Sequence, residues 1–216
     1  MSESSFVIEK IPVERFVLSG SELVLESAGV IIFDTKNITY DRETDEVSFI
    51  IYMVYRDQEK KQRYEILYGK ADGGDERSTN PGDETATQCA IREVREESGG
   101  GFVFTEDQLE DCSRVVIPTT AHKCWITKHP SWPHGDTVCT RLEIFLVPVS
   151  GKPEGFSKNK DFERMDAVRV TLPKEGTPTF KRNGEEVATT GFFKKRVFAH
   201  SNMRDAFIKI ANKIGV

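Results

Sequence analysis

The sequence predicts a mixed α/β sandwich. Short runs rich in β-branched residues recur along the chain, and only two segments show apolar residues repeating with helical periodicity. No GxGxxG motif follows the first of these runs, which argues against a doubly wound dinucleotide-binding fold. Strands interleaved with few helices therefore indicate a mixed sheet with helices packed on it.

The first elements in chain order are an extension and three strands. Residues 1–26 alternate weakly and are expected to form an N-terminal extension packed on a main domain of residues 27–216. Predicted strands follow at residues 27–34 (SAGVIIFD), 46–56 and 64–68, and the last runs into a glycine-bearing loop at residues 69–82.

The apolar period changes over residues 84–98. Apolar residues from Ala86 to Val94 fall in one stripe at roughly 100° per residue, which predicts an amphipathic helix. Three consecutive glycines from residue 99 favour the left-handed geometry of a helix C-terminus, so the helix is expected to stop there.

The rest of the chain is expected to complete the sheet and to close with a second helix. Strands are predicted at residues 114–118, 121–127, 138–149 and 167–172. The amphipathic segment at residues 202–214 predicts the closing helix, with Ser201 as its N-cap.

Charge and composition exclude several classes of protein. The formal net charge of −5 argues against an extended nucleic-acid-binding surface, and no apolar run reaches the length of a membrane span. The four cysteines show neither a CxxC pair nor zinc-ligand spacing and are expected to be buried free thiols. The chain as given is expected in the cytoplasm or nucleus; removal of a signal peptide would equally allow a secreted effector that acts inside a host cell.

The most informative segment is GDETATQCAIREVREESG, residues 82–99. Glu93, Glu96 and Glu97 lie at i, i+3 and i+4, which places three carboxylates along one side of the predicted helix. Like charges this close repel one another unless a cation lies among them. Carboxylates are the ligands that Mg²⁺ and Mn²⁺ prefer, so the segment is either a site for such an ion or an ordinary solvated helix face.

Glu84, seven intervening residues and REVREESG together resemble the Nudix box, whose core is E-x7-R-E-U-x-E-E-x-G with U an aliphatic residue. SAGVIIFD resembles the opening strand of Nudix domains, and LYGKADGG resembles the segment before the box. Two positions depart from the Nudix pattern. Ser78 stands where the box glycine is expected; the nearest glycine is Gly74, which implies an insertion of four residues. Gly100 replaces an aliphatic residue. The resemblance covers residues 27–172 and implies a Nudix-type α/β/α sandwich that hydrolyses a diphosphate linkage.

The resemblance also implies roles for the box residues. Glu93, Glu96 and Glu97 would bind Mg²⁺ or Mn²⁺, which neutralises diphosphate oxygens and activates the attacking water. Arg92 would orient a glutamate and hold Glu84 across the junction between loop and helix.

The general base varies in this family and often lies outside the box. Glu163, just before a predicted strand, is the first candidate and Asp161 is the second. An ordinary acidic surface loop is the alternative interpretation of both.

Substrate contacts are expected from three further residues. Lys70 and the backbone at Gly74 lie in the loop before the box, where a phosphate group could approach them. Trp132 could stack on a purine or methylated guanine. The alternatives are a solvated lysine and a tryptophan that packs its loop onto the domain. Two basic runs, residues 181–182 and 194–196, are expected to be solvated, although either could meet an anionic substrate.

Two substrate classes fit the resemblance. Within the family, the chain is similar to fungal enzymes related to diphosphoinositol polyphosphate phosphohydrolases and to mRNA-decapping effectors. The aromatic loop favours the 5′ cap of RNA or a related dinucleotide, the basic residues favour a diphosphoinositol polyphosphate, and we place capped RNA narrowly first. A Nudix-fold binding module without catalysis is the third hypothesis, which the intact acidic residues disfavour.

Overall fold

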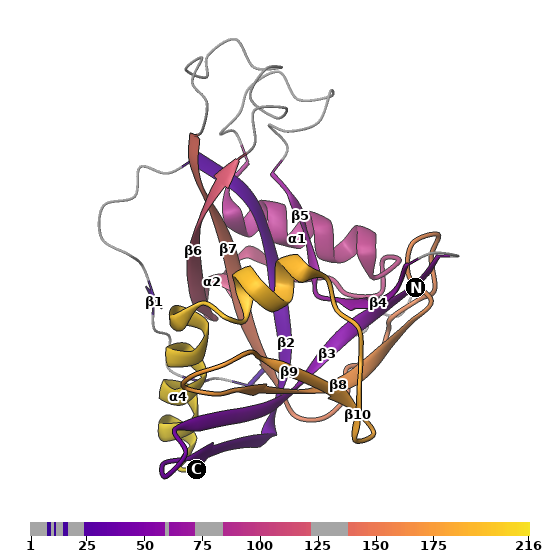
Figure 1. Ribbon diagram of the computed structural model, residues 1–216. Helices are drawn as coiled ribbons and strands as arrows, with labels where there is room; N and C mark the ends of the chain where they lie inside the picture. Colours follow the sequence, from indigo (N-terminus) through magenta and orange to yellow (C-terminus); the bar gives the residue numbers. More distant parts are fainter. Residues whose placement is uncertain are drawn as a thin grey trace.

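The computed structural model of the chain describes residues 8–9, 11, 15–16, 24–58, 61–71, 84–121 and 138–216. Its strands are β1 (Arg15–Phe16), β2 (Val24–Asp41), β3 (Glu46–Gln58), β4 (Lys61–Glu65), β5 (Leu67–Lys70), β6 (Ser113–Ala121), β7 (Val138–Val149), β8 (Arg164–Leu172), β9 (Thr179–Arg182) and β10 (Glu185–Glu186). Its helices are α1 (Ala86–Glu97), α2 (Glu106–Glu110), the π-helix η1 (Phe193–Val197) and α4 (Ser201–Ile214). The predicted mixed α/β class is confirmed (Figure 1).

The described strands form one mixed sheet. Its order is β1-β6-β7-β2-β3-β8-β9-β10, with β4 paired to β3 and β5 paired to β2. The pairs β2–β7 and β1–β6 are parallel, and the other described pairs are antiparallel. One edge of β2 lies against β7, while its other edge lies first against β5 and then against β3. The sheet therefore branches beside β5. Helix α1, which carries the residues that resemble the Nudix box, packs there.

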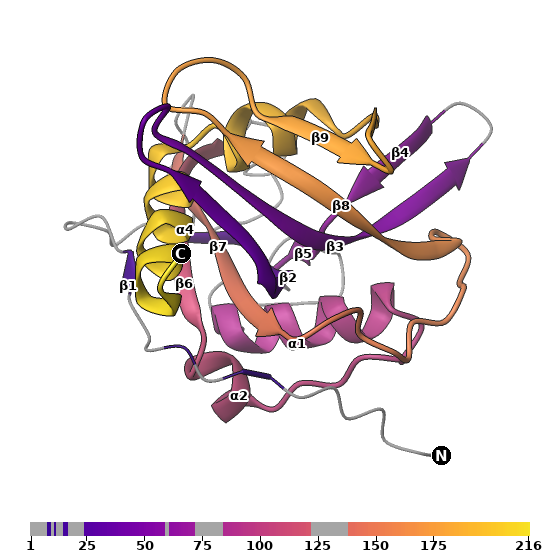
Figure 2. The same ribbon diagram turned by 90° about the horizontal axis from the view of Figure 1, so that it is seen from below.

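Side chains of β2 alternate between two hydrophobic cores, as the two-residue period of a strand requires. Ala28, Val30 and Ile32 pack in the core beneath α1, whereas Ile31 and Phe33 pack in the core beneath η1 and α4. Helices α1 and α4 therefore cover opposite faces of the sheet, which Figure 2 shows from below. Within the described residues, no helix is long and apolar enough to span a membrane.

The two predicted helices correspond to α1 and α4, and four predicted strands also agree with the structure. The strands at residues 46–56, 138–149 and 167–172 correspond to β3, β7 and β8, and the strand at 27–34 is the central part of the longer β2. Residues 24–26 also belong to β2, and Ile8 forms an isolated bridge with Val149. The domain boundary after residue 26 stays a prediction.

Three predicted elements are wrong in detail. The single strand at residues 64–68 is two strands, because the chain leaves β3 and turns to pair with β2 on passing Ile66. The break between residues 118 and 121 does not exist, because β6 keeps unbroken register with β7 past Pro118; residues 122–127 lie outside the described part. The N-cap of α4 is His200 and not Ser201: its Nδ1 accepts a hydrogen bond from the Asn202 N–H at 3.2 Å.

Short elements escaped the sequence prediction. These are β1, β9, β10, α2 and η1, none longer than five residues. Elements this short carry too few apolar positions for a period to be recognised, and they form because the packed sheet and helices supply their partners.

Candidate active site

Helix α1 begins after Glu84 and not at it. Thr85 is the N-cap: its side chain accepts a hydrogen bond from the Gln88 N–H, while the Gln88 side chain accepts one from the Thr85 N–H. This reciprocal capping box satisfies two N–H groups at the start of the helix. The helix ends just before Gly99 and Gly100, whose φ angles of 67° and 79° are left-handed, as the three-glycine run predicts. Glu84 therefore belongs to the end of the loop.

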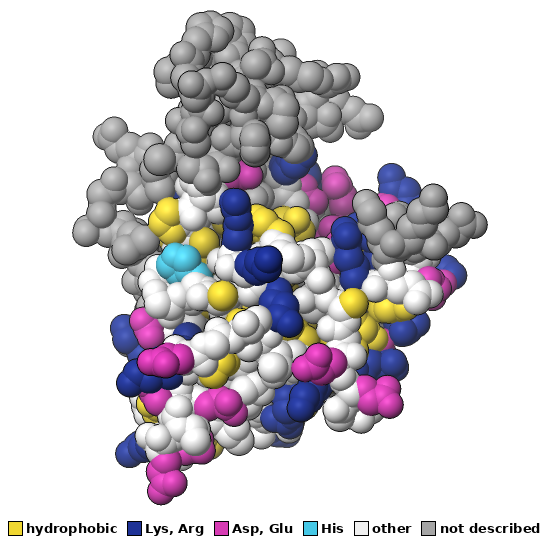
Figure 3. Space-filling model, in the orientation of Figure 1, with side chains coloured by type: hydrophobic (Ala, Val, Ile, Leu, Met, Phe, Trp, Pro, Cys, Tyr) yellow, Lys and Arg dark blue, Asp and Glu magenta, His cyan; other side chains and the backbone are white. Residues whose placement is uncertain are grey.

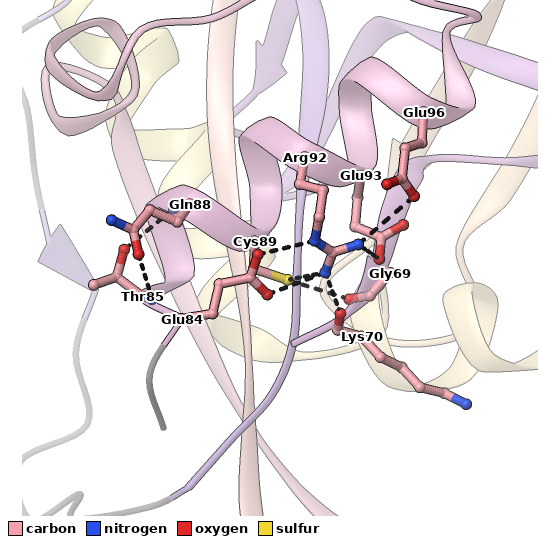
Figure 4. A network of polar contacts seen from close by, with 9 residues as sticks. All are labelled: Gly69, Lys70, Glu84, Thr85, Gln88, Cys89, Arg92, Glu93 and Glu96. Atoms are coloured by element: carbon pink, nitrogen blue, oxygen red, sulfur yellow. Dashed lines mark hydrogen bonds and ion pairs between the residues drawn. The ribbon is translucent and has the colours of Figure 1, made fainter. Parts of the chain in front are cut away.

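Arg92 joins the loop, the helix and strand β5. Its Nε and Nη2 atoms donate to the two carboxylate oxygens of Glu84 at 2.9 and 3.0 Å, a bidentate pairing that fixes the plane of the guanidinium. Its Nη1 atom donates to Glu93 Oε1 at 2.7 Å, and Nη2 also donates to the carbonyl oxygen of Lys70 at 2.7 Å. Figure 4 shows the guanidinium between these groups. Arg92 thereby holds Glu84 and orients Glu93.

The Glu93 carboxylate lies directly over the backbone of Gly69 in β5. A Cβ atom at residue 69 would lie 2.0 Å from Glu93 Cδ, a distance that no real side chain could occupy. Gly69 therefore provides the space into which the carboxylate fits. Burial raises the pKa of Glu93, and the adjacent Arg92 guanidinium opposes that effect.

Glu97 lies one helical turn further along the same side of α1. Its Oε2 atom accepts a hydrogen bond from the backbone N–H of Tyr68 at 2.8 Å, so β5 positions this carboxylate as well. Burial raises the pKa of Glu97 well above its usual range, and the charges of Glu93 and Glu65 act in the same direction. The Tyr68 N–H and the charge of Arg56 oppose the rise. The site thus places two carboxylates where water stabilises their charge poorly.

The third carboxylate of the cluster is accessible. The Glu96 side chain is 63% exposed and lies 3.7 Å from Arg92 Nη1. It borders a hollow of about 610 Å³ on the outer side of α1. The hollow is lined by Gln88, Ile91, Arg92, Arg95, Glu96, Gly100 and Glu106. Arg92 and Glu96 are the box residues that line this open hollow, whereas Glu93 and Glu97 do not line it.

The donor set suits a hard divalent cation. Glu93, Glu96 and Glu97 offer carboxylate oxygens from successive turns of one helix, and burial of two of them leaves negative charge that a cation would stabilise. Arg92 already offsets part of that charge at Glu93. In the part of the chain that the structure describes, no group of three His, Cys, Asp or Glu side chains is arranged as a complete metal-binding group. The metal ligands therefore stay a prediction.

Of the residues expected to bind substrate, only Lys70 is described. Its side chain is exposed and extends away from the Arg92 network (Figure 4). Gly74 and Trp132 lie outside the described residues. Substrate contacts at all three positions stay predictions.

Both candidates for the general base lie on a loop attached to the end of α1. The Asn159 side chain donates a hydrogen bond to the carbonyl oxygen of Glu97 at 2.7 Å, which holds the loop there. Glu163 is paired with Lys158 at 3.2 Å and with Arg164 at 3.8 Å. Asp161 lies 3.2 Å from Arg56, the same arginine that lowers the pKa of Glu97. The structure thus brings the loop to the box, and the role of either carboxylate stays a prediction.

Three residues of the site were missed from the sequence. Gly69 and Tyr68 position Glu93 and Glu97, and the half-buried Arg56 lies near Glu97. A glycine inside a predicted strand signals the close approach of another group, so Gly69 carried a usable signal. A backbone N–H and an arginine on a distant strand carried none, because only the folded sheet brings them to the helix.

Comparisons with known proteins give low similarity. No protein-family model and no curated protein match the chain. Among solved structures, it is similar to a MutT/nudix family protein from Enterococcus faecalis, with 13% identity, a TM-score of 0.40 and coverage of 92% of this chain and 64% of that one. An Ap4A hydrolase from C. elegans is similar with 15% identity, a TM-score of 0.32 and coverage of 67% and 79%.

A Nudix hydrolase from M. smegmatis is also similar, with 9% identity, a TM-score of 0.39 and coverage of 89% of both chains. The present chain thus spans 64% of the length of the E. faecalis protein. Similarity at this level assigns neither a family nor an activity, so function depends on the chemistry of the site.

Proposed function

We propose that this chain is a divalent-metal-dependent hydrolase of the Nudix type, which uses water to cleave a diphosphate linkage in a phosphorylated small molecule or RNA end. The observation that carries the proposal is that Glu93 and Glu97 lie side by side on α1 and are both partly buried. Burying two like charges is unfavourable unless a cation stabilises them. A helix whose only role was structural would gain stability from uncharged residues at these positions.

Each box residue has a definite task in this proposal. Glu93, Glu96 and Glu97 would hold Mg²⁺ or Mn²⁺. When bound, such an ion neutralises the diphosphate oxygens and lowers the pKa of a water molecule. Arg92 keeps Glu93 in one orientation through the 2.7 Å hydrogen bond, and Glu84 keeps the guanidinium of Arg92 in place.

We assign the proton acceptor to Glu163, with Asp161 as the second candidate. The carboxylate of Glu163 is partly exposed, and its loop is attached to the end of α1 through Asn159. A general base contributes on the order of 10²-fold or more to turnover, so Glu163→Gln should lower kcat by that amount. The matched variant Asp161→Asn should retain most of the activity; the reverse result would move the assignment to Asp161.

The substrate is best assigned by two substitutions that affect different kinds of contact. A cap is held by stacking of a flat base, worth roughly 1–3 kcal/mol, so Trp132→Ala should lower kcat/KM for capped RNA by about 5- to 150-fold. It should leave a diphosphoinositol polyphosphate largely unaffected. Lys70→Ala should affect the inositol compound more, and that effect should fade with added salt because it is electrostatic.

Capped RNA is our first substrate and a diphosphoinositol polyphosphate our second, the latter favoured by the exposed cation of Lys70 beside the box. Equal losses on both substrates for Trp132→Ala would mean that the tryptophan only holds its loop in place. If wild-type turnover were also faster on the inositol compound, the second substrate would replace the first.

One panel tests the activity itself. Wild-type protein and Glu97→Gln are incubated with capped RNA, dinucleoside polyphosphates and diphosphoinositol polyphosphates in Mg²⁺ or Mn²⁺, and products are identified by mass. Cleavage at a diphosphate linkage by wild type alone supports the proposal. A protein that binds one of these compounds and releases no product under any condition is a binding module, and that result would replace the proposal.

A further inference from the structure

The loop of residues 155–163, which leads into β8, closes the C-terminal end of α1. The Ser157 N–H donates to the carbonyl oxygen of Ser98 at 3.1 Å, and the Asn159 side chain donates to that of Glu97 at 2.7 Å. The last carbonyl groups of a helix have no partner within the helix and need one from elsewhere. The loop supplies such partners, and one of its two bonds reaches the backbone of a residue in the acidic cluster.

Two neighbouring glycines after α1 are needed for different reasons. Gly100 has a left-handed φ of 79°, and a Cβ atom there would meet nothing within 4 Å. The φ angle of Gly101 lies outside the left-handed region, yet a Cβ atom there would lie 1.7 Å from the carbonyl oxygen of Gly155. Backbone geometry therefore requires the first glycine, and the close approach of the loop requires the second. The glycine run both ends the helix and makes room for the loop.

The other end of the loop is attached to β3. The Glu163 N–H donates to the carbonyl oxygen of Tyr55 at 2.9 Å, and Asp161 pairs with Arg56 at 3.2 Å. Between the two carboxylates, the side chain of Phe162 is completely buried in the core beneath α1. Both candidates for the proton acceptor are thus held on β3, whereas the carboxylates of the box are held on α1.

The side chain of Asn159 joins these two parts. Its Oδ1 atom accepts the backbone N–H groups of Asp161 and Phe162, both at 2.9 Å, and so shapes the turn that carries the acidic residues. Its Nδ2 atom donates to the carbonyl oxygen of Glu97. One amide therefore connects the turn on β3 to the end of α1 at the residue that bears a carboxylate of the box.

We propose that Asn159 is a positioning residue, which fixes the separation between the carboxylate of Glu97 and those of Asp161 and Glu163. The inference rests on the proposed function, because this separation matters only if Glu97 holds the metal ion and the loop supplies the proton acceptor. A proton acceptor must lie within hydrogen-bond reach of the attacking water. A displacement of about 1 Å can cost on the order of 10²-fold in rate. Asn159 acts through these carboxylates and has no need to touch the substrate.

The variant Asn159→Asp separates the two tasks of the side chain. Its carboxylate can still accept the N–H groups of its own turn, but it cannot donate to the carbonyl oxygen of Glu97. With the compound that wild type cleaves in the panel above, kcat per folded molecule should fall about 10- to 100-fold. KM should change little, because the contacts that bind substrate remain.

Asn202→Asp is the matched control. It removes a bond of the same kind, from the Asn202 side chain to the carbonyl oxygen of Val116 at 3.2 Å, and it adds the same charge on α4. Acidic and basic side chains lie side by side over α4, so the added charge has neighbours of both signs there (Figure 3). This variant should keep the kcat of wild type.

Hydrogen exchange of backbone amides in EDTA provides a measurement that does not depend on activity. In Asn159→Asp, exchange at Ser157 should become about 5-fold faster, the effect of one lost hydrogen bond, because the loop is no longer held on α1. Exchange at Asp161 and Phe162 should stay slow, since their acceptor remains. In Asn159→Ala, exchange should become faster at all three residues.

The two glycines provide a second pair of variants. Gly101→Ala should displace the loop through its collision with Gly155 and should reproduce the loss of kcat per folded molecule. Gly100→Ala strains the backbone at a left-handed φ but meets no atom of the loop. It should lower stability and keep kcat per folded molecule.

Several results would overturn the positioning role. These are normal kcat in Asn159→Asp and in Gly101→Ala, an equal loss of kcat in either control variant, and unchanged exchange at Ser157 in Asn159→Asp. Failure of the proposed function is seen separately, as normal hydrolysis by Glu97→Gln or as no cleavage by wild type. The positioning role would then fall as well, while the faster exchange at Ser157 would still show that Asn159 attaches the loop to α1.

Discussion

Helices α1 and α4 cover opposite faces of one sheet, but they bury different chemistry. Helix α4 buries large apolar residues: Phe207 stacks on Phe49 with ring centroids 3.5 Å apart and meets Phe33 edge-on at 5.3 Å. Helix α1 buries mostly small side chains, such as Ala86 and Ala90, and so lies close to β2 and β5. Small residues contribute less hydrophobic free energy, so we expect α1 to anchor the sheet less strongly than α4 does.

The carboxylates increase that difference. Glu93 and Glu97 on α1 lose hydration on folding, and the resulting rise in their pKa values is an energetic cost to the ionised protein. Helix α4 buries no carboxylate, because its described acidic residue, Asp205, is exposed. One helix is thus arranged for stability, and the other retains groups that stability alone would remove. Substitutions on α1 and on α4 can therefore test this contrast in stability and in activity.

The largest effect is expected from Phe207→Ala. Removing a fully buried aromatic ring leaves a cavity between two other rings, so the free energy of unfolding should fall by about 3–5 kcal/mol. Val94→Ala on α1, also fully buried, should cost only about 1–2 kcal/mol because fewer atoms are removed. Both values come from denaturant titration of the metal-free protein. Equal losses would mean that the two helices anchor the sheet equally.

The second effect is on turnover, and here substitutions on α1 should matter more than a substitution on α4. Glu96→Gln and Glu97→Gln should each lower turnover on the order of 10²-fold or more, while the fold survives. Glu97→Gln should also raise the melting temperature of the metal-free protein, because a neutral amide avoids burial of charge. Asp205→Asn on α4 is the matched control and should change neither quantity. Near wild-type turnover in either glutamine variant would exclude the assigned metal site.

A smaller effect is expected in the pH dependence of stability, to which a group on α1 and a group on α4 should contribute in opposite directions. Burial raises the pKa of Glu97 in the folded protein above the ordinary glutamate value of about 4.3, so the free energy of unfolding should fall as pH rises through the raised pKa. Burial lowers the pKa of His200, the N-cap of α4, from 6.5, so stability should fall as pH drops from 6.5 through the lowered pKa.

Denaturant titrations across pH in EDTA would measure both dependences. Glu97→Gln should remove the first, and His200→Asn, which can still cap the helix, should remove the second. Mg²⁺ should stabilise wild type more at about pH 8 than at about pH 5, because the cation favours the ionised carboxylates. A pH profile of Glu97→Gln identical to that of wild type would show that Glu97 is not the group responsible.

The same contrast explains what the sequence could predict. The periods of α1 and α4 and the carboxylate spacing at Glu93, Glu96 and Glu97 are local features, so they were readable before folding. The division of β4 from β5 was not, because it depends on which strand the chain meets after Ile66. The hydrogen bond from Tyr68 to Glu97 spans 29 residues and exists only because β5 pairs with β2. Local chemistry was predictable, and the groups that tune it were not.

The smallest expected effect concerns an arginine on each helix. Arg92 of α1 is paired with Glu84, and Arg204 of α4 is paired with Asp45 in the turn between β2 and β3. Both pairs are partly buried and attach a helix to a preceding loop, so double-mutant cycles with alanine should give coupling energies above about 0.5 kcal/mol for each. If the losses of unfolding free energy in the two single variants simply add up in the double variant, the two residues of that pair do not interact.

The turnover number should distinguish Arg92 from Arg204, although the stability measurements are expected to give similar results for both. Arg92→Ala also releases Glu93, so kcat should fall well beyond the loss that partial unfolding explains, whereas Arg204→Ala should keep the kcat of its folded fraction. Glu84→Ala leaves the hydrogen bond from Arg92 to Glu93 possible, so its loss of kcat should be smaller than that of Arg92→Ala. Equal kcat losses for Arg92→Ala and Arg204→Ala, each corrected for folded fraction, would mean that Arg92 is only an anchor. The contrast between the helices would then rest on the carboxylates alone.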